Sequence, residues 1–435
     1  MKKHSVLLKD DKCEGCTSCV KNCPTKAIRV HRGKASIKEE LCIDCAECIR
    51  TCEYHAKYTK TDDLDILNNY SYPVALIPPS FYGQFGKKVK PELIPVALRE
   101  LGFKEVFNAA QGAEAISRQT FSFLKNNSGP FISSSCPVVV RIIKLLYPEL
   151  INYLIPFKSP VELMAQNISN INSDAEVIFI TPCPAKLTSV ENPPGQEKSY
   201  LSNAVAVDIV YPLILDILEE KNFTSQEYGG KIPYLGIGWG KSGGEEKILS
   251  REKERRVISA SGIHNVKNIL SELSRDNIKG VKYFELVACP QGCVGGVLNV
   301  RNPYQAKYNI KDLINRNKQD FSDEIPAFDY DLERKFSPDN VSKLDDNIEK
   351  AMEKLDKLEE VRDILPGLDC AACGAPDCET LAEDIVNGLA EKTDCIFMLR
   401  KEVSELADRI SGLTQVLPPV MSEEKRDKNE TKENN

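Results

Sequence analysis

The chain of 435 residues lacks any apolar run near the length of about 20 residues that a helix needs to cross a bilayer. It also lacks an excess of positive charge, because the net charge is −7 with both signs spread along the chain. A basic face is needed to neutralise phosphates, so nucleic acid is not expected as a partner. The apolar stretch after the basic start, Val6 to Leu8, is too short for a signal peptide. We therefore expect a cytoplasmic protein without membrane contact.

Cysteine, in contrast, is abundant and grouped. In a reducing cytosol, grouped cysteines bind metals or perform redox chemistry, because disulfides rarely persist there. The 16 cysteines fall into four sets of four: Cys13, Cys16, Cys19 and Cys23; Cys42, Cys45, Cys48 and Cys52; Cys136, Cys183, Cys289 and Cys293; and Cys370, Cys373, Cys378 and Cys395. Four thiolates are what one cubane 4Fe-4S cluster needs, and zinc would also take four. All 16 cysteines are therefore predicted metal ligands.

The first eight cysteines form a doubled run within residues 1–68. The spacing from Cys13 to Cys23, followed by proline, is typical of a bacterial two-cluster ferredoxin, and the run from Cys42 to Cys52 repeats it. The fourth cysteine of each run reaches the other cluster in such domains. The pattern predicts one cluster on Cys13, Cys16, Cys19 and Cys52, and a second on Cys42, Cys45, Cys48 and Cys23. Two zinc sites are the alternative, but zinc ligands rarely come in this rhythm.

Residues 70–325 alternate β-type runs with helical stretches. Strands are expected at 73–77, 130–133, 177–180 and 283–287, and helical patterns lie between them, for example at 91–101 and 138–146. Such alternation is typical of α/β proteins with largely parallel sheets. Three of the strands lead directly into Cys136, Cys183 and Cys289, and strand C-termini are where open α/β sheets place ligands. We predict an α/β fold for this domain, within an α+β multidomain chain.

Three motifs carry the single cysteines of this domain. They read Ser133-Ser134-Ser135-Cys136-Pro137, Thr181-Pro182-Cys183-Pro184-Ala185-Lys186, and Glu285-Leu286-Val287-Ala288-Cys289-Pro290-Gln291-Gly292-Cys293-Val294-Gly295-Gly296. Together, and in this order, they resemble the catalytic domain of the FeFe (iron-only) hydrogenases. The resemblance implies an H-cluster, in which the four cysteines hold a 4Fe-4S cube and Cys293 bridges to a di-iron unit bearing CO, CN and a dithiolate. It also implies reversible splitting of H2.

The same resemblance implies further site residues. Lys186 would hydrogen-bond a cyanide, because a buried anion needs a charge-assisted donor. The family's cofactor-contacting positions correspond to Pro79, Ser80, Ser159, Pro160, Gly240 and Ser242. Glu114 and Arg118 match a proton-path pair, with an ordinary i,i+4 surface pair as the alternative. For Ser80 and Ser159 the alternative is a plain turn role beside proline.

Several positions depart from the family's pattern. Ser135 stands where the family has a proton-relay cysteine, and an alcohol is a far weaker acid than a thiol. Thr181 and Val287 replace methionines that lie against the di-iron unit. Ser189 replaces a glutamate, and a second acid is missing near Ala110. The combination resembles the sensory branch of the family. Slow proton delivery is compatible with sensing, because a sensor depends on whether H2 occupies the site rather than on the rate of turnover.

The C-terminal region carries the last four cysteines. Residues 326–365 are expected to form a helical linker, and residues 366–413 a small α-helical 4Fe-4S domain that ends in a helix. The cysteine spacing resembles the small 4Fe-4S domain of corrinoid iron–sulfur proteins, with zinc as the alternative. The apolar steps of four and three from Leu399 to Leu413 suit a helix packing on its own domain, or a homodimer. Residues 414–435 are polar without periodicity and are predicted to be disordered.

Three functions follow from these features. The first is an anaerobic hydrogen or redox sensor that splits H2 slowly and relays electrons through three 4Fe-4S clusters besides the H-cluster. Its partners would be H2, protons and a redox partner such as ferredoxin or a signalling protein. The second is a working FeFe hydrogenase linked to ferredoxin. The third is a non-catalytic electron carrier or scaffold that holds a cube without the di-iron unit.

Overall fold

The chain forms two compact units, Met1–Val341 and Ser342–Asn435. The computed structural model describes residues 4–221, 223, 230–250, 256–317, 324–339, 344–345 and 347–414. The predicted disordered tail therefore lies, apart from its first residue, outside the described residues. Within the described ranges, no helix is long and apolar enough to cross a membrane.

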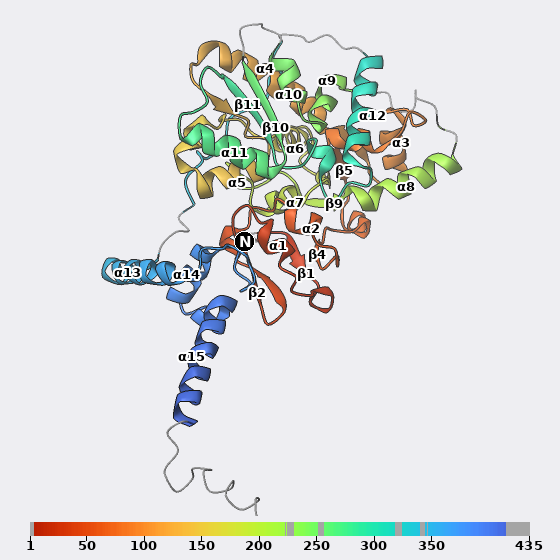
Figure 1. Cartoon of the computed structure of the whole chain (residues 1–435). Coiled ribbons are helices and arrows are strands. Elements are labelled where there is room, and N and C mark those ends of the chain that lie inside the picture. Colours follow the sequence, from red (N-terminus) through yellow and green to blue (C-terminus); the bar gives the residue numbers. More distant parts are fainter. Residues whose placement is uncertain are drawn as a thin grey trace, which may run out of the picture. The chain divides into compact units, whose positions relative to one another are not determined.

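The N-terminal repeat, residues 4–59, is built twice on one plan (Figure 1). Its elements are η1 (Asp10–Lys12), α1 (Ser18–Lys21) and β2 (Ile28–His31) in the first half, η2 (Glu39–Leu41), α2 (Glu47–Arg50) and β4 (Lys57–Thr59) in the second half, and β1 (Val6–Leu8) and β3 (Lys34–Ile37) as pairing strands. β1 pairs antiparallel with β4, and β2 with β3, so the two halves are tied together. Positive φ angles recur at the same places in each half, for example at Gly15 and Asp44.

Two parallel sheets form the core of the central part, residues 70–317. The four-stranded sheet has the order β6-β5-β8-β9 and the three-stranded sheet the order β10-β11-β7. Their bounds are β5 (Pro73–Ile77), β6 (Glu105–Asn108), β7 (Phe131–Ile132), β8 (Glu176–Thr181), β9 (Asn203–Ala206), β10 (Val257–Ser261) and β11 (Tyr283–Val287). Alternate residues of β5 enter different apolar clusters, because Val74 and Leu76 point to one face and Ala75 and Ile77 to the other.

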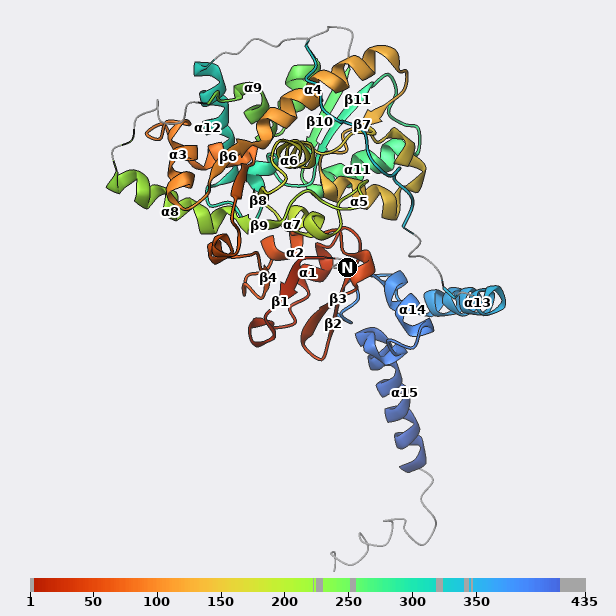
Figure 2. The ribbon, with the colours of Figure 1, turned by 180° about the vertical axis from the view of Figure 1, so that it is seen from behind.

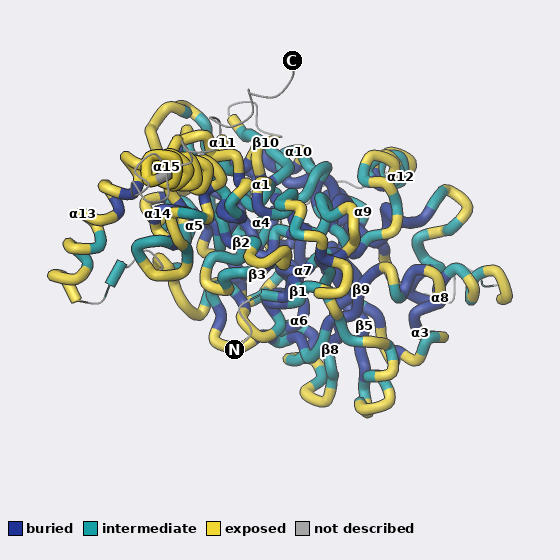
Figure 3. The backbone as a smooth tube through the Cα atoms, turned by 60° about the horizontal axis from the view of Figure 1, so that its bottom comes forward, coloured by how far each residue is buried: buried dark blue, intermediate teal, exposed yellow. Residues whose placement is uncertain are grey.

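Helices cover both faces of the four-stranded sheet, which explains why its strands are almost continuously apolar. The helices of the central part are α3 (Leu93–Glu100), α4 (Ala109–Asn126), α5 (Pro137–Leu146), α6 (Pro160–Ile171), α7 (Pro184–Glu191), α8 (Val207–Glu220), α9 (Tyr234–Ile237), α10 (Gly244–Leu249), α11 (Ile263–Ser274) and α12 (Pro303–Arg316). α6 packs on one face of the sheet, while α3 and α8 pack on the other (Figure 2). Figure 3 shows the buried residues gathering in the interior around β5 and β9.

The predicted α/β class is confirmed. The strands expected at 73–77, 177–180 and 283–287 are β5, β8 and β11, and the strand expected at 130–133 is present as the two-residue β7. The helical patterns at 91–101 and 138–146 are α3 and α5. Three further strands that were not expected from the sequence, β6, β9 and β10, complete the two parallel sheets.

The C-terminal unit is helical, with α13 (Ile348–Ile364), α14 (Cys378–Val386) and α15 (Ile396–Thr414). Only the second part of the range 326–365, expected as a linker, belongs to this unit, which begins at Ser342. In α13, Leu358 and Val361 pack with Leu381 and Cys395 in the apolar core of the unit. The reason is that α13 carries its few buried apolar residues on the face toward α14. In α15 the apolar residues predicted at helical spacing are present but exposed (Figure 3).

Candidate metal centre

The ends of three strands place the four central cysteines. β7 leads to Cys136, β8 to Cys183 and β11 to Cys289, and the 3₁₀ helix η8 (Cys293–Gly295) starts at the fourth cysteine. A proline follows both Cys136 and Cys183, and α5 and α7 begin at these prolines. The fixed φ of proline at the first helical position thus holds each cysteine at the junction of a strand and a helix.

All four cysteines line one cavity of about 730 Å³. Burial and the neighbouring thiols raise the pKa of Cys183 and Cys289, and they raise the pKa of Cys293 to about 12. Four thiols that meet in a buried space cannot all ionise without a compensating positive charge. A bound metal cluster supplies that charge, because metal coordination deprotonates cysteine.

Two of the predicted site residues lie where this cavity meets a second one of about 450 Å³. Ser135 and Lys186 line both cavities. The ammonium of Lys186 lies 5.8 Å from the ring centroid of Phe179. Ser159 lines the second cavity, where its hydroxyl accepts a hydrogen bond from the backbone N–H of Glu162 at 3.3 Å. The structure therefore places Lys186, Ser135 and Ser159 around two adjoining cavities.

An acidic wall closes the first cavity on another side. Glu245 and Glu285 both line it, and each is about 3% exposed. Glu285 accepts hydrogen bonds from the N–H groups of Gly243 (2.9 Å) and Glu246 (2.7 Å), which fixes it to the start of α10. Burial, followed by the charge of Glu285, raises the pKa of Glu245 to about 8. At neutral pH this wall therefore holds an exchangeable proton, on a carboxyl that accepts a hydrogen bond from the hydroxyl of Tyr283.

The surroundings of Ser80 fit a bound ligand group. Ser80 is fully buried in η4 (Pro79–Gln84), and within the described part of the chain its hydroxyl has no hydrogen-bond partner. A Cβ at Gly240 would lie 2.8 Å from the Ser80 nitrogen, so only glycine permits this approach of η7 (Gly238–Gly240) to η4. Both helices contact η8, which begins at Cys293. Ser80 and Gly240 do not themselves line the cavity, whereas the four thiols that do line it fit a 4Fe-4S cube.

Other predicted residues lie away from the cavity. Glu114 pairs with Arg118 at 3.7 Å and accepts a hydrogen bond from the Gly236 N–H at 3.1 Å, and neither side chain lines the cavity. Burial raises the pKa of Glu114. The hydroxyl of Ser242 lies 3.2 Å from that of Ser259. Pro160, at the start of α6, packs against Gly112 of α4.

The N-terminal repeat brings its eight cysteines together in the crossed arrangement. Cys19 lies among Cys13, Cys16 and Cys52, and burial raises its pKa to about 11. The second group consists of Cys42, Cys45, Cys48 and Cys23. Burial, together with the charge of neighbouring thiols that include Cys23, raises the pKa of Cys42, Cys45 and Cys48. Lys57 lies between the groups and lowers the pKa of both Cys19 and Cys48. Its ammonium is buried without a hydrogen-bond partner among the described residues, which fits a group that faces cluster sulfides.

The C-terminal unit gathers the last four cysteines around a tight loop. Cys373, Cys378 and Cys395 pack in the core of the unit, and burial, with a smaller effect of the Cys395 and Cys370 thiols, raises the pKa of Cys373. Positive φ angles at Ala371 and Gly374 curve the loop around them.

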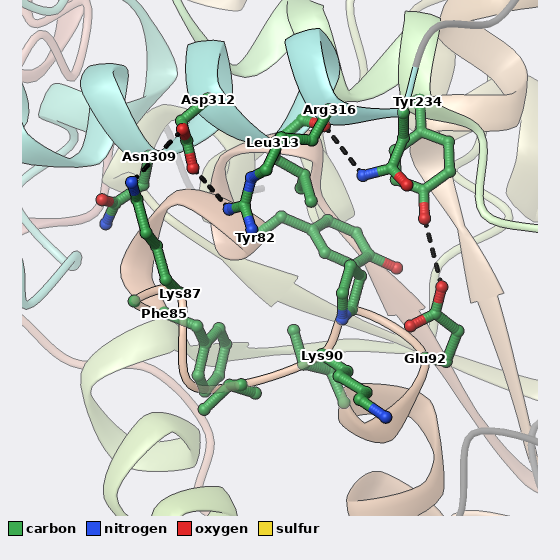
Figure 4. Close-up of a pocket in the computed structure, with 15 residues that line it drawn as sticks. Tyr82, Phe85, Lys87, Lys90, Glu92, Tyr234, Asn309, Asp312, Leu313 and Arg316 are labelled. Carbon is green, nitrogen blue, oxygen red and sulfur yellow. Dashed lines mark hydrogen bonds and ion pairs between the residues drawn. The ribbon is translucent and has the colours of Figure 1, made fainter.

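A separate surface cleft lies between η4, α9 and α12 (Figure 4). Several of its charged groups have partners within the cleft: Lys87 lies 3.5 Å from Asp312, which also contacts Arg316, and the Tyr234 hydroxyl donates to Glu92 at 3.1 Å. No cysteine lines this cleft. It is therefore not a candidate for the redox centre.

Comparison with known proteins places the central part in a family. The iron only hydrogenase large subunit, C-terminal domain, matches residues 71–228 and 238–297, which is half of the chain. The chain belongs to the iron-only hydrogenase family. A 4Fe-4S dicluster domain matches residues 5–53, and an Fe-S cluster family matches residues 365–397. The iron-only hydrogenase fold is thus flanked in this chain by iron–sulfur domains.

Individual relatives of this iron-only hydrogenase family member are distant. Iron hydrogenase 1 of Clostridium pasteurianum is 26% identical over 255 residues, which cover 47% of this chain and 44% of that protein. An uncharacterized protein of Methanocaldococcus jannaschii is 31% identical over 72 residues, covering 17% of this chain and 32% of that protein. The chain thus matches less than half the length of these curated relatives.

Solved FeFe hydrogenase structures are also similar to this chain. HydA1 from Chlamydomonas reinhardtii is 16% identical with a TM-score of 0.42, covering 57% of this chain and 87% of that one. A HydA structure of stepwise H-cluster assembly is 17% identical with a TM-score of 0.44, covering 60% of this chain and 91% of that one.

Sequence reasoning missed three side chains at the cavity. Glu245 directly follows the glycine turn that ends at Gly244, and Trp239, which also lines the cavity, directly precedes Gly240. Their position beside a predicted cofactor-contacting turn was the available signal. Asp44, which lines the cavity from the N-terminal repeat, gave no signal, because its contact depends on how that repeat docks.

Proposed function

We propose that this chain binds H2 at the cavity of Cys136, Cys183, Cys289 and Cys293, splits it slowly into two protons and two electrons, and serves as a hydrogen or redox sensor. The observation that carries the proposal is the meeting of four cysteines, from three separate motifs, in one cavity whose walls also hold a lysine and two buried carboxyl groups. When bound, an H-cluster supplies the iron site that polarises and cleaves H2.

The chain's own residues would then hold the cofactor and handle protons. The four cysteines would hold the cube, and Lys186, which lines the same cavity, would donate a charge-assisted hydrogen bond to an anionic cyanide ligand. Glu245 exchanges a proton with the cavity, because a carboxyl with a pKa of about 8 binds and releases protons near neutral pH with little driving force. The hydroxyl of Tyr283 holds this carboxyl in place.

Electrons would leave through the N-terminal repeat. Cys45 lines the same cavity as the four central cysteines, so the second cluster of the repeat would lie beside the cube. Lys57 connects the surroundings of the second and first clusters. Cys16 of the first cluster is exposed, which suits electron exchange with a redox partner such as ferredoxin or a signalling protein.

Ser135 supports slow turnover, because it places an alcohol where the family has a thiol and lines the cavity. A ferredoxin-linked hydrogenase is the second candidate, and the protonated Glu245 favours it as a substitute proton relay. Turnover of Ser135→Cys separates the two candidates. We expect roughly a tenfold rise if the alcohol limits proton delivery, and no rise if Glu245 already suffices. Ser134→Cys is the matched control, since Ser134 lines only the second cavity and bonds the Phe157 carbonyl.

The decisive test is infrared spectroscopy of the anaerobic protein loaded with the di-iron cofactor, first under argon and then under H2. Sharp CO and CN bands that shift with H2 are expected. Absence of such bands in protein with intact 4Fe-4S clusters would replace this proposal with the electron carrier or scaffold.

A further inference from the structure

Arg50 belongs to the N-terminal repeat, yet its guanidinium reaches η8, the 3₁₀ helix that begins at Cys293. It ends α2, two residues after Cys48, and its side chain is 21% exposed. Nη2 donates to the carbonyl oxygen of Gly295 at 2.8 Å, and Nη1 pairs with Glu47 at 3.0 Å. The charge of the guanidinium also acts on the thiol of Cys289. One fixed cation therefore joins the helix behind the second cluster to a cysteine of the central cavity.

We propose that Arg50 is a positioning residue that raises the reduction potential of the 4Fe-4S cube held by the central cysteines, so that the potential depends on the docked N-terminal repeat. The inference uses one element of the proposed function, namely that Cys136, Cys183, Cys289 and Cys293 hold a cube. It needs neither the di-iron unit nor reaction with H2.

The electrostatic argument concerns the charge of the cube. Adding one electron makes the cube and its thiolates more negative, and a nearby fixed cation stabilises this reduced state more than the oxidised state. Hydrogen bonds to ligand sulfur act in the same direction and are among the main determinants of cluster potentials. Arg50 places its charge next to Cys289, and its planar fork offers N–H donors to ligand sulfur. With Arg50 in place, the cube accepts electrons from H2 oxidation more readily than it would without it.

The repeat contains its own control residue. Lys21 ends α1, two residues after Cys19, just as Arg50 ends α2, two residues after Cys48. Lys21 is exposed, whereas Arg50 contacts the central part. The two positions therefore differ in what the cation faces, and not in their place relative to their own cluster helix.

The test is a redox titration followed by electron paramagnetic resonance on full-length protein that carries its 4Fe-4S clusters and no di-iron cofactor. The signal lost in Cys289→Ala identifies the cube. Arg50→Gln is expected to shift the cube to a more negative midpoint potential. Arg50→Lys, which keeps the charge but loses the planar fork, should shift it less. Lys21→Gln should leave the cube unchanged.

Three results would overturn the inference: an unshifted cube in Arg50→Gln, an equal shift in Lys21→Gln, or no signal that depends on Cys289. If Arg50→Gln does not assemble its clusters, Arg50→Lys carries the test, and an unshifted cube there counts against the hydrogen-bonding role. A shifted cube in a protein that never reacts with H2 would leave this inference standing and reject only the proposed function.

Discussion

The two halves of the N-terminal repeat share their cysteine spacing and turn geometry, but they meet different surroundings. The first half has Gly15 in its turn and Lys21 at the end of its helix, and its Cys16 is exposed. At the same two places the second half has Asp44 and Arg50, and both side chains contact the central part. The two halves thus bind cysteines in the same way but differ in two side chains. Asp44 and Arg50 hold the second half against the central part, whereas the first half lies near solvent.

Asp44 is the more deeply buried of the two, with a side chain that is 0% exposed. Its carboxylate accepts hydrogen bonds from the Ser5 N–H at 2.8 Å, from Arg141 at 2.9 Å and from the Thr188 hydroxyl at 2.6 Å. Arg141 lies in α5 and Thr188 in α7, the two helices that begin directly after Cys136 and Cys183. One carboxylate thus fixes the second half against the two helices that follow Cys136 and Cys183.

Breaking this contact should give the largest effect. Asp44→Ala leaves Arg141 buried and unpaired, and we expect it to lower the free energy of unfolding by about 3–5 kcal/mol. Glu14→Ala is the control, because Glu14 is exposed beside the matching Gly15, and it should cost less than about 0.5 kcal/mol. Anaerobic denaturant titration, with cluster content followed by absorbance, measures both. Equal destabilisation by the two substitutions would remove the asymmetry between the halves.

Cysteine spacing in the sequence is enough to predict which cysteines group together. Contacts between side chains from distant segments could not be predicted from it. Cysteine spacing gave the crossed grouping of the repeat, and three strands leading into cysteines gave the central cavity. Glu114 and Arg118 do form the expected pair, but α4 holds them away from the cavity. Asp44 and Arg50 look like ordinary surface charges in sequence, because their partners become visible only once the repeat is docked.

The central cavity also has two different walls. Asp44 and Cys45 form the wall toward the repeat, and Glu245 belongs to an acidic wall. Glu245→Gln removes the exchangeable proton and should lower H2 turnover by about 10²-fold, while leaving all cluster potentials unchanged. In the wild type, turnover in the direction of proton reduction should fall as the pH rises above about 8, because Glu245 then has no proton to donate. The variant should lack this fall.

Activity assays over a range of pH, alongside redox titrations, test the separation of the two walls. Glu246→Gln is the matched control, since Glu246 is the next residue and does not line the cavity. A shifted cube potential in Glu245→Gln would show that the two walls do not act independently.

The smallest effect is expected where the two halves share a residue. Lys57 is 3% exposed, and its charge acts on Cys19 of the first cluster and on Cys48 of the second. Lys57→Met removes a cation that stabilises the reduced state of both clusters, so both midpoint potentials should fall, each by about 60 mV, which corresponds to a tenfold change for a one-electron couple. Lys60→Met, at an exposed position three residues on, is the control.

Equal shifts of the two clusters would mean that the interior of the repeat is electrostatically symmetric. The difference between the two clusters would then come entirely from Asp44 and Arg50, which contact the central part. A shift confined to one cluster would instead place part of the asymmetry inside the repeat, because Lys57 would then face one cluster more closely than the other. Redox titration of both clusters in the same variant distinguishes these outcomes. It shows whether the difference between the two clusters arises inside the repeat or at its contact with the central part.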